Sequence, residues 1–217
     1  MLIVHFWVTQ LRCVLDLSSR NVQGKYFLEH KNQFEGLSSE TDVDGLFLFS
    51  IVAPELSQFN TIKNKAEIMA LKVLYVQQGR PYGDFSIGHF SMKPSFVEEM
   101  ETFISKSSPN LSEFEFMVIK EKDRREARIM RIRRMETEEW QFNYLKLFFK
   151  ILSVRFSKKK YTNKIEKLKF YASAYNCGFL KSEQYINQVS NKEFFPLFSL
   201  KKFKYKDVAE WFYLNTQ

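Results

Sequence analysis

Residues 42–60 read DVDGLFLFSIVAPELSQFN, and this stretch decides the fold class. Leu46 to Val52 is apolar on every side of a helical wheel, which indicates a fully buried helix, and the acidic residues before it suit a helix N-terminus. A buried strand is the competing interpretation of so short an apolar run. Pro54 bends or ends the element, and Glu55 follows it directly. The stretch therefore predicts a buried element that carries one carboxylate near its end.

Helical signals dominate the rest of the chain, in which glycine and proline are scarce. Capping-box spacing occurs at Asn64 with Glu67 and at Ser95 with Glu98, and Gly79 stands where a glycine commonly ends a helix. Apolar residues recur at helical spacing in the later segments. We expect a mainly α protein. The predicted helices lie at 64–78, at 95–105, within 120–156, from about 165 to 177, at 181–190 and at 205–214, and residues 111–119 are amphipathic.

The chain divides into three predicted parts. Residues 1–41 form an N-terminal extension or flap, because 18–41 are polar and rich in turn formers. Residues 42–180 form the core, and 181–217 add C-terminal helices packed on it. The apolar start is too short to span a membrane and lacks the basic residues and cleavage site of a clear signal peptide, so we expect it to pack as a strand or helix; a truncated export signal stays open.

The formal charge is +8, which suits an anionic partner such as nucleic acid, an acidic glycan or an anionic membrane. Residues 120–134 hold eight Lys and Arg among three acids. Those acids stand at helical i, i+3 and i, i+4 spacing from the bases, as on a solvated helix face. We therefore expect no nucleic-acid partner.

Metal and disulfide chemistry find little support in the sequence. The three histidines are isolated and the two cysteines, Cys13 and Cys177, are far apart, so no metal site and no cofactor are expected. The two cysteines either pair in an oxidising compartment or remain buried thiols, and the sequence leaves this open.

Three separated pieces suggest chemistry when they are taken together. Glu55 leaves a very apolar element, so we expect its pKa to be raised, as a general acid requires; an ordinary surface Glu is the alternative. Residues 82–96, YGDFSIGHFSMKPSF, offer glycines and aromatic faces for a ligand, or form a loop filled by its own aromatic rings. Residues 170–179, FYASAYNCGF, place Tyr and Asn at a helix end closed by Gly178.

In this order the pieces resemble the lysozyme-like superfamily of soluble lytic transglycosylases and goose-type lysozymes. Those proteins carry a catalytic Glu at the end of a buried helix, a Ser-x-Gly-Leu-Met-Gln-x-x-Pro loop and an Ala-x-Ala-Tyr-Asn-x-Gly helix end. This chain reads PELSQFN, SIGHFSMKP and ASAYNCG at the three places. The wording FSIG-x-F-x-MKPSF is also similar to an uncharacterised Bacteroidetes branch of the superfamily.

The resemblance implies a lysozyme-like helical domain with a glycan cleft. Glu55 would be the catalytic general acid/base on MurNAc-GlcNAc linkages of peptidoglycan, with no second carboxylate needed. Asp84 and Glu67 are the candidates if a second one exists. The implied substrate-binding residues are Ser86, Gly88, Phe90, Ser91, Tyr175 and Asn176.

Two departures from the family pattern affect the expected function. Ser91 stands in place of the loop glutamine, and the distance from Glu55 to Gly88 is long enough for an extra helix. The first hypothesis is a glycan-cleaving enzyme of the cell envelope or periplasm, a lytic transglycosylase in the first place and a glycoside hydrolase otherwise. The alternative is a catalytically inactive peptidoglycan-binding or envelope scaffold, with an envelope protein as a further possible partner. The sequence does not determine the oligomeric state.

Overall fold

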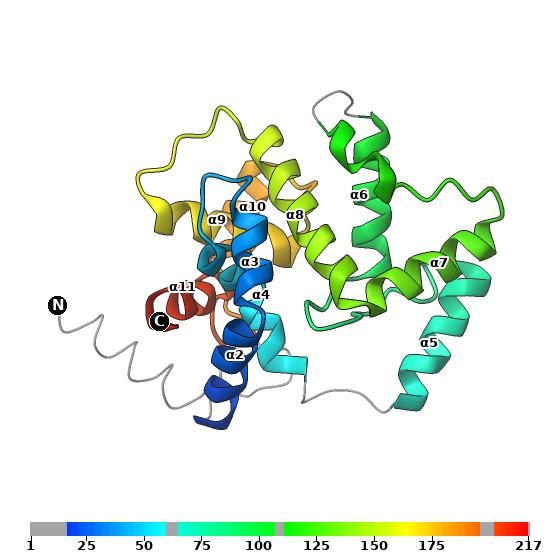
Figure 1. Cartoon of the computed structure of the whole chain (residues 1–217), viewed down its shortest axis with the longest axis horizontal. Helices are drawn as coiled ribbons and strands as arrows, with labels where there is room; N and C mark the ends of the chain where they lie inside the picture. The colour runs from blue at the N-terminus through cyan, green and yellow to red at the C-terminus, as the bar shows by residue number, and fades with distance from the viewer. Residues whose placement is uncertain (1–16, 60–64, 107–110, 196–201, 217) are drawn as a thin grey trace. The chain divides into compact units, whose positions relative to one another are not determined.

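A computed structural model describes residues 17–59, 65–106, 111–195 and 202–216 (Figure 1). The mainly α prediction is confirmed. In chain order the elements are α2 (Leu17–Glu29), α3 (Lys31–Ser38), α4 (Gly45–Phe59), α5 (Lys65–Gln78), α6 (Pro94–Lys106), the 3-10 helix η1 (Ser112–Met117), α7 (Arg124–Glu136), α8 (Glu138–Arg155), α9 (Lys164–Cys177), α10 (Glu183–Ser190) and α11 (Tyr205–Asn215). The predicted N-terminal element at residues 1–16 lies outside the described residues.

The chain forms two compact units. The first unit combines residues 1–60 with 159–217, and the second unit is the continuous segment 61–158. The predicted division into 1–41, 42–180 and 181–217 follows other boundaries, since 42–180 includes the whole second unit together with parts of the first. Each unit has its own set of buried side chains.

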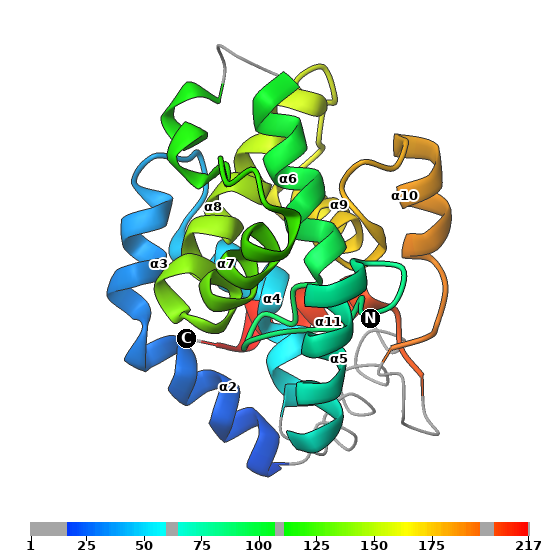
Figure 2. The same ribbon diagram turned by 90° about the vertical axis from the view of Figure 1, so that its right-hand side faces the viewer.

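Helix α4 is the centre of the first unit. It packs against α2, α3, α9 and α11, and α10 lies beside α9 (Figure 2). From Phe47 to Ala53 the described side chains of α4 are fully buried, as its all-round apolar sequence predicts. Helix α11 runs antiparallel to α4, because Tyr205 at its start contacts Ile51 and Tyr213 near its end contacts Asp44.

The predicted flap at 18–41 is wrong, because this segment forms helices α2 and α3. Phe27 and Phe34 are buried there, and both rings pack against Phe49 of α4 at centroid distances of 4.9 and 5.5 Å. Two aromatic side chains facing the core thus hold a largely polar segment in place. Burial of large aromatic rings outweighs the weak local preferences of polar residues.

In the second unit, three arginines of α7 contact neighbouring elements of the same unit. Arg131 is buried and makes a bidentate ion pair with Glu101 of α6, at 2.6 and 3.0 Å. Arg128 donates to the Val76 carbonyl on α5, and Arg134 donates to the Met117 carbonyl and lies 4.0 Å from the centre of the Trp140 ring. Arginines at three-residue spacing therefore join α7 to its neighbours, and three of the eight basic residues of 120–134 serve packing within the unit.

Asp44 starts helix α4 as its N-terminal cap. One carboxylate oxygen accepts a hydrogen bond from the Phe47 N–H at 2.7 Å, and the other contacts Lys164 and the Tyr213 hydroxyl. Burial raises the pKa of Asp44, but the hydrogen bonds from Lys164, Phe47 and Tyr213 and the Lys164 charge outweigh it and hold the pKa below its usual value. The carboxylate therefore stabilises the first unit in its charged form.

Replacing Asp44 by Ala should lower the free energy of unfolding at neutral pH by about 0.5–2 kcal/mol, because α4 loses its cap. The folded pKa is depressed, so this stabilisation is present above about pH 4 and disappears as the pH falls through the folded value. Denaturant unfolding at pH 7 and at pH 3 measures both effects. The matched control is Asp42→Ala, which removes only an exposed ion pair with Lys167 and should cost less than about 1 kcal/mol. Equal losses at both pH values would contradict this assignment.

Candidate functional site

Glu55 lies in the last part of helix α4. Pro54 is inside the helix, which continues to Phe59, so the proline does not end the element. The side chains around Glu55 on this helix, from Ile51 to Pro54 and at Leu56, are buried, whereas Glu55 itself is partly exposed. The carboxylate thus stands at the edge of the apolar core with access to solvent.

Two tyrosines from other helices accompany Glu55. Tyr175 of α9 is 7% exposed and Tyr205 of α11 is 3% exposed. Burial, with the Glu55 charge as the second cause, holds the pKa of both phenols well above that of free tyrosine. Both hydroxyl groups therefore remain protonated and can donate hydrogen bonds at any pH at which the protein works.

Tyr205 connects the carboxylate to the helix backbone. Its hydroxyl lies 3.1 Å from the Ile51 carbonyl oxygen, one turn before Glu55, and it also donates to the Glu55 carboxylate. Because the hydroxyl carries one proton, the two acceptors share it. Sequence reasoning missed Tyr205, since position 205 belongs to no motif and its contact with α4 spans most of the chain.

The end of α9 has the geometry that its sequence predicts. Gly178 adopts a φ of 103°, which favours glycine, and its N–H donates to the Ala174 carbonyl at 3.0 Å. Tyr175 is buried just before this end, and Asn176 is half-buried. Cys177 carries a free thiol whose pKa burial raises to about 11, and Cys13 lies outside the described residues.

The remaining predicted site residues lie in a loop of the second unit. Ile87 and Met92 pair through two backbone hydrogen bonds of 2.8 and 3.1 Å and close a tight turn that holds Gly88 to Ser91. Ser86, Gly88 and Ser91 are partly exposed. Ser91 has a φ of 51° and Gly88 a φ of 72°, so the turn passes twice through the left-handed region.

Gln141 of α8 fills this turn from inside. Its side-chain oxygen accepts a hydrogen bond of 3.0 Å from the Phe90 N–H, and both residues are buried. A β-carbon on Gly88 would lie 2.1 Å from the Gln141 amide nitrogen and would displace that side chain, and the left-handed φ of Gly88 also favours glycine. The ring of Phe90 is fully buried and packs edge-on against Phe142, so it offers no face on which a sugar can stack.

Close packing or a left-handed backbone also explains why glycine stands at positions 83 and 79. A β-carbon on Gly83 would lie 2.7 Å from backbone atoms of Leu71 and Tyr75 on α5, and Gly79 ends α5 with a φ of 92°. Phe85 is also buried. The clustered glycines therefore serve close packing within the second unit, and the loop is filled largely by its own apolar side chains, which was the alternative that the sequence left open.

One further sequence prediction in this region is wrong, and another lies outside the described residues. The capping box at Ser95 is wrong, because α6 begins at Pro94 and the Ser95 hydroxyl and N–H both donate to Asp84, at 2.9 and 3.0 Å. Asp84 thus holds the loop onto α6. The side chain of Glu67 and the cap at Asn64 lie outside the described residues.

The predicted site residues divide between the two units. Glu55, Tyr175 and Asn176 belong to the first unit, where the Glu55 charge helps to hold the pKa of the Tyr175 phenol above its usual value. Ser86, Gly88, Phe90 and Ser91 belong to the second unit. Among the residues that the structure describes, no three His, Cys, Asp or Glu side chains gather as metal ligands would.

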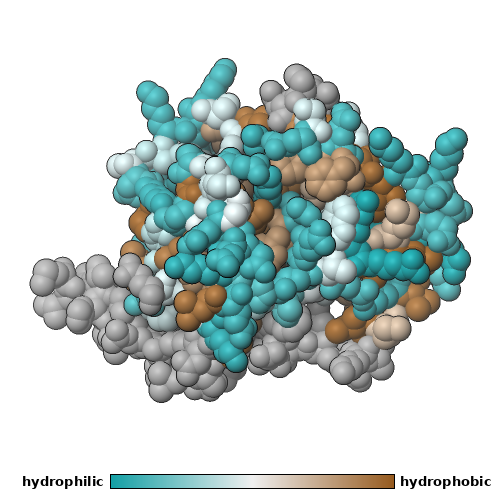
Figure 3. Space-filling view, viewed as in Figure 1, coloured by the Kyte–Doolittle hydropathy of each residue, from teal (hydrophilic) through white to brown (hydrophobic). Residues whose placement is uncertain are grey.

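Hydrophilic residues cover most of the face drawn in Figure 3, with smaller apolar areas between them. Within the described ranges, no helix is both long enough and apolar enough to cross a membrane.

Comparison with known proteins gives no relative on which to base a function. No protein-family model, no curated protein and no solved structure matches the chain.

Replacing Gly88 by Ala should destabilise the second unit by about 1–3 kcal/mol, because the left-handed φ is strained for alanine and the methyl group meets Gln141. The matched control is Gly36→Ala in α3, where a β-carbon meets nothing within 4 Å and helix propensity should make the change neutral or stabilising. Thermal unfolding measures both variants. A Gly88→Ala protein as stable as wild type would refute the tight Gln141 contact.

Replacing Tyr205 by Phe should lower the free energy of unfolding by about 1–3 kcal/mol, because the buried Ile51 carbonyl and the Glu55 carboxylate lose a donor. The same change at Tyr213, on the same helix, removes an exposed hydrogen bond to Asp44 and should cost less than about 1 kcal/mol. Urea unfolding of the two variants makes the comparison. A larger loss at position 213 than at 205 would contradict the buried role of Tyr205.

Proposed function

We propose that this chain is a lysozyme-like enzyme that cleaves peptidoglycan at MurNAc-GlcNAc linkages, with Glu55 as its single general acid/base. The observation that best supports the proposal is that the Glu55 charge helps to hold the pKa of two buried phenols, Tyr175 and Tyr205, above the usual value. These phenols belong to two other helices, and the resemblance implies Tyr175 near the catalytic carboxylate. A partly exposed carboxylate beside two phenols that stay protonated is suited to proton transfer at a solvent-accessible edge.

The proposed reaction needs one carboxyl group in two protonation states. Protonated Glu55 gives its proton to the glycosidic oxygen as the bond from that oxygen to the anomeric carbon breaks. The C6 hydroxyl of the same sugar then bonds to the anomeric carbon, and its proton passes to the Glu55 carboxylate, which restores the acid. The product is an anhydro sugar, and no second carboxylate takes part, in contrast to most glycosidases.

The phenol of Tyr205 positions the carboxylate in this scheme. By sharing its proton between Glu55 and the Ile51 carbonyl, it orients the carboxyl group relative to the helix. The net positive charge of +8 suits a substrate whose peptide stems carry carboxylates. A place in the cell envelope or periplasm belongs to the same proposal.

A catalytically inactive peptidoglycan-binding scaffold is the second candidate. It is supported by Ser91, which stands where the family pattern has a glutamine that contacts the glycan, so this contact is missing here. A scaffold would keep affinity for the sacculus without cleaving it.

Digestion of purified peptidoglycan distinguishes the candidates. Wild-type protein should release anhydro-muropeptides, and Glu55→Gln should lose activity by at least about 100-fold, because it cannot cycle a proton. The control Glu29→Gln changes an exposed carboxylate that pairs with Lys25 on α2 and should keep full activity.

Mass spectrometry of the products separates the outcomes. Reducing-end products from wild type would indicate a hydrolase. Binding without cleavage by both proteins would support the scaffold, and full activity of Glu55→Gln would contradict the role of Glu55.

A further inference from the structure

Helix α5 of the second unit presents an apolar face to solvent. Met69 is 58% exposed, Val73 49% and Leu74 38%, and helical spacing puts these three large side chains next to one another. From residue 68 to the end of α5, the exposed side chains are Met69, Ala70, Val73, Leu74, Gln77 and Gln78. This part of the face therefore carries no charge, and such a contiguous apolar patch is typical of an interaction surface.

The opposite side of α5 is held by α7. Tyr75 is fully buried, and its hydroxyl accepts a hydrogen bond of 2.7 Å from Arg131. Arg128 donates to the Val76 carbonyl at 3.2 Å. Among the described helices, α7 is the one that packs extensively against α5 (Figure 1). Because α5 is anchored from one side, its apolar face forms a convex ridge on the unit.

The positive charge of the second unit is concentrated beside this ridge. Residues 61–158 contain 18 Lys and Arg against 13 Asp and Glu. The segment 120–134 alone contains eight against three, so it accounts for the whole surplus of positive charge in the unit. This segment includes α7, the helix that packs against α5.

The acids of this segment have local roles at the start of α7. Glu121 accepts a hydrogen bond from the Asp123 N–H at 2.9 Å, and Asp123 accepts one from the Glu126 N–H at 2.8 Å. Glu126 lies 3.7 Å from Arg125. Carboxylates at the first turn compensate the helix dipole, and the neighbouring bases extend into solvent. The exposed bases are Lys120, Lys122, Arg124 and Arg125.

These bases lie toward the C-terminal end of α5. Helix α7 runs antiparallel to α5, because Lys72 pairs with Glu136 and Arg128 reaches Val76. Arg124 stands one helical turn before Arg128 and therefore beyond the end of α5. The apolar ridge thus continues into a basic surface.

We propose that the apolar face of α5, together with the exposed bases of 120–125, binds the surface of an anionic membrane. The three large apolar side chains enter the boundary between headgroups and acyl chains, as the apolar face of an interfacial helix does. Tyr82, which is 60% exposed just after α5, lies at the level of the headgroups, where tyrosine is favoured. The lysines and arginines contact anionic headgroups.

Charge favours lipid over a second copy of the chain as the partner. Each copy carries a formal charge of +8, so self-association brings like charges together, whereas anionic headgroups attract the same surface. A bilayer also adapts to a convex ridge. Insertion of so few apolar side chains gives weak binding by itself, and the adjacent bases supply the second contribution that stable anchoring needs.

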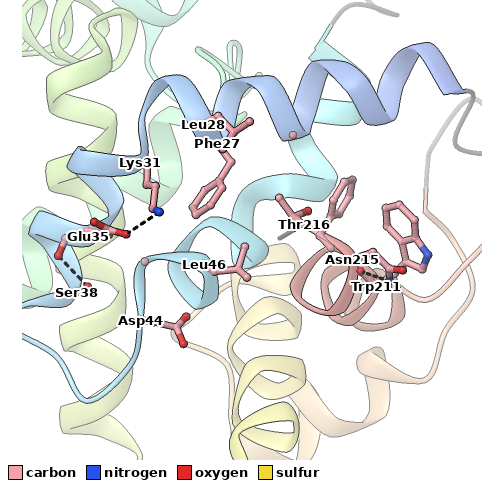
Figure 4. A pocket seen from close by; sticks show the side chains of 13 residues that line it. Phe27, Leu28, Lys31, Glu35, Ser38, Asp44, Leu46, Trp211, Asn215 and Thr216 are labelled. Carbon is pink, nitrogen blue, oxygen red and sulfur yellow. Dashed lines mark hydrogen bonds and ion pairs between the residues drawn. The ribbon is translucent and has the colours of Figure 1, made fainter.

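Co-sedimentation of the full-length protein with vesicles tests the proposal. The vesicles contain equal parts of phosphatidylglycerol and phosphatidylcholine, and pure phosphatidylcholine gives the neutral comparison. The test variant is Met69→Gln/Val73→Gln, because glutamine has a good helix propensity and both positions are exposed. The matched control is Leu28→Gln on α2. Leu28 is 69% exposed and, with Lys31, lines a groove of the first unit (Figure 4).

Wild type and Leu28→Gln should bind the anionic vesicles equally and leave the neutral ones unbound. The double variant should bind by about tenfold or more weakly, because the apolar insertion is lost. Lys122→Gln/Arg124→Gln should weaken binding by about fivefold for each charge removed, and added salt should weaken wild-type binding. Circular dichroism checks that each variant is folded, and Leu74→Gln replaces the double variant if that one does not fold.

Three results would overturn the proposal. The first is no binding of wild type to anionic vesicles, and the second is equal binding by wild type and Met69→Gln/Val73→Gln. The third is a dimer in analytical ultracentrifugation that the double variant dissociates, which would assign the face to a second copy of the chain. The proposal is independent of the proposed function, because membrane binding needs no chemistry at Glu55 and the vesicles contain no glycan.

Discussion

Burial of helix α4 is the constraint on which the first unit depends. Its side chains from Phe47 to Ala53 are removed from water, and α2, α3, α9 and α11 supply the apolar cover. Pro54 removes one backbone hydrogen bond from within this helix, since proline has no N–H to donate, and its ring crowds the preceding turn. Near this point Tyr205 donates to the Ile51 carbonyl, so a side chain from α11 helps to satisfy the backbone beside the proline. Glu55 follows directly and shares that tyrosine.

Much of the helical framework could be predicted because its signals are local. The apolar run of α4, Gly79 after α5 and Gly178 after α9 each act within a few residues of the chain. The segment 18–41 was predicted wrongly because its polar composition concealed Phe27 and Phe34, whose burial depends on a partner in α4. Ser95 likewise matched a capping pattern, but Asp84 from the preceding loop binds its hydroxyl.

In the candidate site, too, local sequence patterns and contacts between distant residues gave different results. The family resemblance suggested Glu55 and Tyr175 as site residues and this stays a prediction, whereas Tyr205, which donates to the Ile51 carbonyl, carries no local signal. The glycines near residue 88 suggested a ligand loop, but the groups that require them are Gln141 and the backbone of α5, which no short pattern reveals. The basic run of α7 is similar, because Arg131 forms a buried ion pair with Glu101 of α6 that no short pattern reveals.

We propose above all that Glu55 delivers its carboxyl group to a glycosidic bond beside Tyr175 and Tyr205. The most direct measurement is a crystal structure of the Glu55→Gln protein with a peptidoglycan tetrasaccharide bound. The account predicts a glycosidic oxygen within hydrogen-bond distance, about 3 Å, of the residue 55 side chain. A structure in which sugar occupies only other surfaces, with residue 55 closed off by neighbouring side chains, would contradict it.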